Sequence, residues 1–94
     1  MLQARAKVDA EVSAAFASLQ TTRRLLDRSK AMVDAAKTSR DVLERQYSAG
    51  SAPFVDFIDA QRVYARAKYD QLASLAAYRA ALVELSRAVG EDLP

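Results

Sequence analysis

The sequence predicts an all-α fold: a long antiparallel two-helix coiled-coil hairpin, with helices over residues 2–48 and 54–89. Three observations support this prediction. The 94-residue chain has only two glycines and two prolines, and one of each lies between residues 50 and 53. The segments on either side are rich in good helix formers such as Ala, Leu, Arg and Glu. Large apolar residues recur every seven positions, which is the repeat of a coiled coil.

The first expected helix, residues 2–48, contains neither glycine nor proline. One row of residues spaced by seven consists of Val12, Leu19, Leu26, Val33, Arg40 and Tyr47. A second row follows three residues later and is mostly small: Ala15, Thr22, Ser29, Ala36 and Leu43. We therefore expect a heptad seam with large side chains at a and small ones at d. Such a helix is about 70 Å long, which is too long for a compact globule of this size.

The expected turn is the segment Ala49-Gly50-Ser51-Ala52-Pro53. Glycine suits the left-handed position after a helix end, and proline suits the first turn of the next helix. We expect Ser51 to cap the second helix, with Ala52 as the alternative if Pro53 takes the first helical position.

The second expected helix, residues 54–89, continues the heptads in two rows. These rows are Phe54, Gln61, Lys68, Leu75, Leu82 and Val89, and Phe57, Tyr64, Gln71, Tyr78 and Leu85. Gly90 is expected to cap its C-terminus, with residues 91–94 as a frayed tail.

Further apolar residues lie beside the predicted seam: Leu25, Met32, Ile58 and Leu72. A lone hairpin leaves such side chains exposed. We therefore expect the chain to self-associate, as a four-helix bundle.

Composition excludes several classes of function. The absence of His and Cys rules out a thiol nucleophile and a His general base, and we expect no metal site, no cofactor and no enzyme activity. The net charge of +2 is too balanced to indicate a nucleic-acid surface. No apolar run reaches the roughly 18 residues of a transmembrane helix, so we expect any membrane-inserted part outside this chain.

An acidic pair, Asp56 and Asp59, lies just after the turn, and no basic residue occurs between Gln46 and Gln61. In the predicted heptad frame the two carboxylates face away from the seam. They could simply stabilise the helix N-terminus, by roughly 0.3–1 kcal/mol each. They could instead line a pore mouth in a symmetric oligomer. As catalytic acids they are poor candidates, because no partner group is evident.

The turn and its flanks resemble the TolC-like outer-membrane efflux proteins. The resemblance rests on Tyr47-Ser48-Ala49-Gly50, on the run from Asp56 to Arg62 (DFIDAQR), and on a helix ending with Leu85 and Ala88-Val89-Gly90. It matches the periplasmic helical hairpin of the second of the family's two internal repeats. It covers nearly all of this chain but only about a quarter of a typical family member, so we expect a fragment of a larger channel.

The resemblance implies a trimeric channel of a Gram-negative outer membrane, whose helices extend into the periplasm as an α-barrel. A periplasmic adaptor protein and an inner-membrane transporter dock at its tip, and drugs, metals or proteins leave through the bore. It implies that Asp56 and Asp59 lie at the periplasmic aperture and that Tyr47 joins the contacts that close it. It also implies that residues Ala49, Gly50, Ser51, Ala52 and Pro53 form the adaptor-docking tip.

Two positions depart from the family pattern. Members often carry a capping Ser or Thr where this chain has Pro53, and some carry a basic gating residue where it has Ala52. An alternative function is that of an interaction module, the coiled-coil hairpin of a periplasmic adaptor protein, although the run from Asp56 to Gln61 argues against it. A cytosolic nucleic-acid-binding or scaffold protein fits the composition alone.

Overall fold

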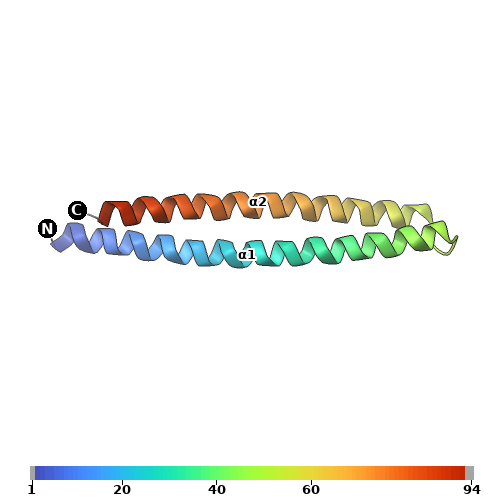
Figure 1. The fold of residues 1–94 in the computed structure, drawn as a ribbon, viewed down its shortest axis with the longest axis horizontal. Helices are drawn as coiled ribbons and strands as arrows, with labels where there is room; N and C mark the ends of the chain where they lie inside the picture. The colour runs from blue at the N-terminus through green and yellow to red at the C-terminus, as the bar shows by residue number, and fades with distance from the viewer. Residues whose placement is uncertain (1, 93–94) are drawn as a thin grey trace. The chain divides into compact units, whose positions relative to one another are not determined.

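The computed structural model describes residues 2–92, which form two α-helices and no strand. Helix α1 spans Leu2–Ser48 and helix α2 spans Phe54–Asp92 (Figure 1). The predicted all-α hairpin is confirmed, and the first helix has the predicted boundaries. Its second helix is three residues longer than predicted.

The prediction that Gly90 caps α2 is wrong. Gly90 lies inside the helix, and Gly50 is the glycine with a positive φ among residues 2–92. Residues 91–92, predicted as part of a frayed tail, are helical. The rest of the predicted tail, residues 93–94, lies outside the described residues.

The chain divides into two compact units, each of which contains part of both helices. The first unit, Asp27–Ala73, contains the turn together with the adjoining halves of α1 and α2. The second unit comprises the residues up to Leu26 and those from Ser74 onward. The candidate functional residues, from Tyr47 to Asp59, all lie in the first unit.

Helix α1 ends in a Schellman motif. Gly50 adopts a φ of 75°, its N–H donates to the carbonyl of Tyr47 over 3.0 Å, and the Ser51 N–H donates to Gln46 over 2.8 Å. These bonds satisfy carbonyl groups that have no partner within the helix. The predicted left-handed glycine is thus confirmed.

The predicted capping role of Ser51 is wrong. Its hydroxyl donates to the Gln46 carbonyl over 3.1 Å, so Ser51 closes the end of α1 rather than the start of α2. Helix α2 begins one residue after Pro53, whose carbonyl accepts the N–H of Asp56 over 3.1 Å. Proline has no N–H to satisfy at this point, which makes it compatible with a helix start.

The seam of α1 follows the predicted heptads. In both rows, every residue from Val12 to Leu43 is buried or half-buried, whereas Tyr47 is exposed. This burial includes Arg40, a charged residue in the row of large seam side chains. The row of large and the row of small side chains were both correctly predicted for this helix.

One of the two rows predicted for the seam of α2 is wrong. The row from Phe57 to Leu85 is half-buried as predicted. In the other row only Leu75 is half-buried, whereas Phe54, Gln61, Lys68, Leu82 and Val89 are exposed. Their place is taken by a row of small residues: Ala60, Ala67, Ser74, Ala81 and Ala88. The small residues also recur every seven positions, so heptad spacing alone does not distinguish the two rows.

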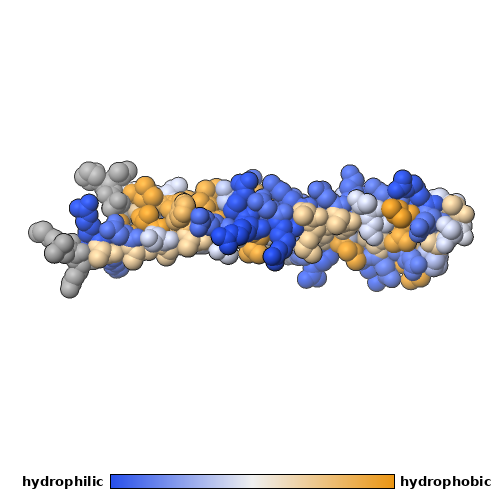
Figure 2. All heavy atoms as spheres, turned by 90° about the horizontal axis from the view of Figure 1, so that it is seen from below, coloured by the Kyte–Doolittle hydropathy of each residue, from blue (hydrophilic) through white to orange (hydrophobic). Residues whose placement is uncertain are grey.

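The core is therefore built from small side chains. The buried residues among those described are Ala15, Leu26, Ser29, Ala36, Ala60, Ala67, Ala81 and Ala88. Large apolar residues remain outside the seam; Met32 is 56% exposed and Leu72 is 67% exposed. Hydrophobic and hydrophilic side chains accordingly alternate over the surface (Figure 2).

Candidate functional site at the turn

Three aromatic rings gather beside the turn, one from the end of α1 and two from the start of α2. The Tyr47 ring stacks on Phe57 with centroids 6.2 Å apart and lies 5.3 Å from Phe54 in a tilted arrangement. Phe54 and Phe57 are 6.3 Å apart. Such pairs favour offset or tilted geometries and add stability beyond the area they bury. The cluster fixes the two helix ends relative to each other at the turn.

Part of this aromatic cluster remains accessible. Tyr47 is 43% exposed and Phe54 is 53% exposed. The five turn residues are exposed as well, except Ala52, which is half-buried. The turn end of this unit thus presents small residues and partly exposed aromatic rings.

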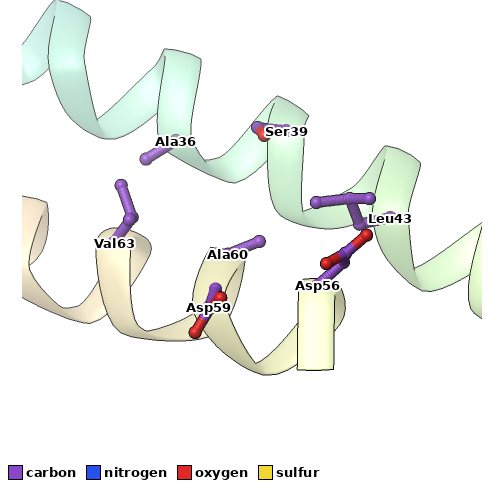
Figure 3. A pocket seen from close by; sticks show the side chains of 7 residues that line it. All are labelled: Ala36, Ser39, Leu43, Asp56, Asp59, Ala60 and Val63. Carbon is purple, nitrogen blue, oxygen red and sulfur yellow. The ribbon is translucent and has the colours of Figure 1, made fainter. Parts of the chain in front are cut away.

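The acidic pair lines an open hollow of about 320 Å³ on one flank of the helix pair. The residues that form this acidic hollow are Ala36, Ser39, Leu43, Asp56, Asp59, Ala60 and Val63. Figure 3 shows Asp56 reaching toward Leu43 of α1, whereas Asp59 lies over its own helix. Both carboxylates are exposed, as predicted, but they flank the seam rather than facing away from it, because the buried row includes Ala60.

The carboxylates of Asp56 and Asp59 are the charged groups that line this hollow. Neither makes an ion pair within residues 2–92. Asp56 lies in the first turn of α2, where the helix dipole favours a negative charge. The dipole therefore accounts for the charge of Asp56, and both carboxylates remain available to a partner.

The opposite flank of the same unit carries a second hollow, of about 390 Å³. The residues that form this basic hollow are Arg40, Ile58, Gln61, Arg62, Tyr64, Ala65 and Lys68. Two cations lie on the Tyr64 ring: the Arg40 guanidinium carbon is 4.6 Å and the Lys68 Nζ is 4.3 Å from the centroid. Both distances fit cation–π interactions.

The Arg40 guanidinium also donates two hydrogen bonds to Asp41 Oδ1, over 3.1 Å from Nε and 2.7 Å from Nη2. These bonds raise the pKa of Arg40 and lower the pKa of Asp41. The sequence did not lead us to predict this site. The available signal was an arginine in a row of large seam residues, together with a lysine four residues after Tyr64.

Neither a metal-binding group nor a membrane-spanning helix is found among the described residues. Within residues 2–92, no group of three or more His, Cys, Asp or Glu side chains could hold a metal ion. No helix in that range is long and apolar enough to cross a membrane. The fold and the exposed features instead define a coiled-coil hairpin protein whose flanks and turn are available for contacts.

The family follows from comparison with known proteins. The model of the outer membrane efflux protein family matches residues 1–91, and the chain belongs to that family. The family comprises channel and transport proteins rather than enzymes. No curated protein and no solved structure matches the chain. The family match confirms the resemblance on which the sequence analysis relied.

Proposed function

We propose that this chain is a periplasmic α-barrel segment of a trimeric outer-membrane efflux channel, and that it lines the exit duct and its periplasmic aperture. The family match supports a component of such a channel. The observation that carries the finer assignment is the acidic hollow, where Asp56 and Asp59 are exposed, unpaired and adjacent to the turn.

Three copies of this pair around an axis gather six carboxylates at one narrow mouth. With an effective dielectric constant near 20, unit charges 15–20 Å apart still interact by about 1 kcal/mol before salt screening. An acidic ring of this kind favours cations over anions and binds multivalent cations. The aperture would therefore select by charge.

Single-channel recording of the full-length channel tests this role. The Asp56→Asn/Asp59→Asn variant should lose cation selectivity and multivalent-cation block, while Asp34→Asn, an exposed carboxylate on α1, should leave both unchanged. Unaltered selectivity and block in the double variant would mean that the two aspartates only stabilise the N-terminus of α2 and do not line the aperture.

In the same proposal, the turn residues 49–53 dock a periplasmic adaptor protein that connects the channel to an inner-membrane transporter. Tyr47 holds the aperture closed through the aromatic cluster it forms with Phe54 and Phe57. Small exposed residues at the turn permit close approach of a partner backbone. Ala49→Trp should abolish copurification of the adaptor with the channel, whereas Ala35→Trp, an exposed site remote from the turn, should not.

A further inference from the structure

The charged residues that line the basic hollow are all positive: Arg40, Arg62 and Lys68. The charge of Arg40 is offset by Asp41, which accepts two hydrogen bonds from its guanidinium. Neither Arg62 nor Lys68 forms an ion pair within residues 2–92. The hollow therefore presents two cations that the described part of the chain leaves without a counter-ion.

The sequence around Lys68 explains why this residue has no acidic partner on its own helix. Residues three or four positions apart are neighbours on a helix surface. For Lys68 these neighbours are Tyr64, Ala65, Gln71 and Leu72, none of which is acidic. The Lys68 Nζ lies instead 4.3 Å from the centroid of the Tyr64 ring. A cation–π contact holds an ammonium group without neutralising it, so Lys68 keeps its charge at the hollow.

Ala65 lies between the two cations. Arg62 precedes it by three residues and Lys68 follows it by three, so each is a surface neighbour of Ala65 on α2. The Cα atoms of Arg62 and Lys68 are about 9 Å apart along the helix axis. Two long side chains can span this distance to reach one ligand. The small side chain of Ala65 leaves room between them, in a hollow of about 390 Å³.

The basic hollow also offers an apolar surface and a further hydrogen-bond donor. Ile58 is half-buried and lies seven residues before Ala65, on the same face of α2. Gln61 is exposed and carries a side-chain amide that can donate. Sites for small molecules combine apolar side chains with a few polar groups in this way. The lining therefore suits an anion that carries an apolar substituent.

Two cations without a counter-ion favour a doubly charged ligand over a single carboxylate. A phosphate monoester carries about −1.5 to −2 charges near pH 7 and has three acceptor oxygens. A guanidinium binds such a group through two parallel hydrogen bonds, and an ammonium binds it as a point charge.

We propose that the basic hollow is a binding site for a phosphate monoester. Its oxygens contact Arg62 and Lys68, and its apolar substituent packs against Ile58 and Ala65. The site is on the flank opposite the acidic hollow, so it leaves Asp56 and Asp59 unpaired. It requires no channel function.

A titration with phenyl phosphate tests the charges of the site. In NMR spectra of the isotope-labelled chain, the ligand should shift the backbone amide signals of residues 58–68 saturably at millimolar concentrations. Arg62→Met and Lys68→Met should each weaken binding at least about fivefold, because each removes a charged donor. Lys30→Met is the control with the same change of charge. Lys30 is exposed in the same unit but does not line the hollow, so this variant should bind as the wild type does.

A second variant tests the shape of the site without changing its charge. Ala65→Leu should fill the space between Arg62 and Lys68 and abolish binding. Ala35→Leu, at an exposed site that does not line the hollow, should not affect it. Circular dichroism of each variant checks that helicity is retained. Benzoate, with one negative charge, and phenol, with none, should bind more weakly than phenyl phosphate.

Vesicles distinguish a soluble phosphate ester from a lipid headgroup of the same chemistry. Sedimentation of the chain with vesicles of phosphatidylcholine and phosphatidic acid, reversed by phenyl phosphate, would identify the lipid. Binding of phenyl phosphate without such sedimentation would identify a soluble ester, and both results support the site.

Three results would overturn the proposal: no saturable shift with phenyl phosphate, equal affinity for benzoate, or unchanged binding in both methionine variants. None of them bears on the proposed channel role, which is tested by conductance of the full-length protein.

Discussion

The Arg40 guanidinium of α1 lies 4.6 Å from the centroid of the Tyr64 ring of α2, so a charged residue of the seam is held by an aromatic face on the partner helix. Lys68 approaches the same ring to 4.3 Å, and Asp41 accepts two hydrogen bonds from Arg40. A polar group at one position of a coiled coil favours the register in which it finds its partners. This contact therefore helps to specify how α1 and α2 align within the unit Asp27–Ala73.

The first prediction concerns that contact. In a double-mutant cycle of Arg40→Leu and Tyr64→Leu, we expect a favourable coupling in the free energy of unfolding, because either substitution alone removes the cation–π interaction. Chemical denaturation followed by circular dichroism provides the four free energies. Strict additivity of the two single effects would show that the two groups are close but do not interact.

The second prediction concerns the small residues of the seam. Ala67→Leu should destabilise the chain by about 1–3 kcal/mol, because Ala67 is buried in the seam and the larger side chain must displace the facing helix. Ala65→Leu, two residues away at an exposed site, is the matched control and should change stability by less than about 0.5 kcal/mol. Equal tolerance at both sites would contradict the close approach of the helices at Ala67.

The third prediction is that replacing glycine by alanine has opposite effects on stability at the two glycines of the chain. Gly50→Ala should destabilise by about 1–2 kcal/mol, because Gly50 has a φ of 75° although space around it is open. Gly90→Ala should stabilise by about 0.5–1 kcal/mol, because Gly90 lies within α2 and alanine loses less entropy there. Thermal unfolding of the two variants measures both effects, and a change of the same sign in both would be inconsistent with the structure.

The fourth prediction concerns acid pH. The hydrogen bonds from Arg40 lower the pKa of Asp41 in the folded state relative to its ordinary value. The contribution of this carboxylate to stability is therefore complete above the ordinary aspartate pKa and is lost as the pH falls through the lowered folded value.

Thermal unfolding between pH 2 and 6 measures that loss. Asp41→Asn should remove part of the acid dependence and leave the remaining profile unchanged in shape. Identical pH profiles for the variant and the wild type would mean that the interaction between Arg40 and Asp41 is no stronger in the folded state than in the unfolded chain.

The sequence was sufficient for the fold class, the boundaries of α1 and the left-handed glycine of the turn, because helix propensity, heptad spacing and glycine geometry are local properties. It was insufficient for the α2 seam, where two rows satisfy the same seven-residue spacing. The choice between the Phe54 row and the Ala60 row depends on how closely the helices approach, which is a property of the pair.

The same ambiguity explains the error at the candidate site. Once Ala60 rather than Gln61 is assigned to the seam, Asp56 and Asp59 move from the outer surface to a flank. The role of Ser51 could not be read from residue preferences either. A hydroxyl at a turn can bond to either helix, and here the Gln46 carbonyl is within reach.

The alanine-rich core also sets how the chain responds to heat. An alanine side chain loses no rotamer freedom when it is buried, but it removes little apolar surface from water. Since the heat capacity change of unfolding scales with the apolar surface exposed, this chain should have a small one for its length. Its stability curve is then only weakly curved, and calorimetry should record a small step in heat capacity between the folded and unfolded baselines.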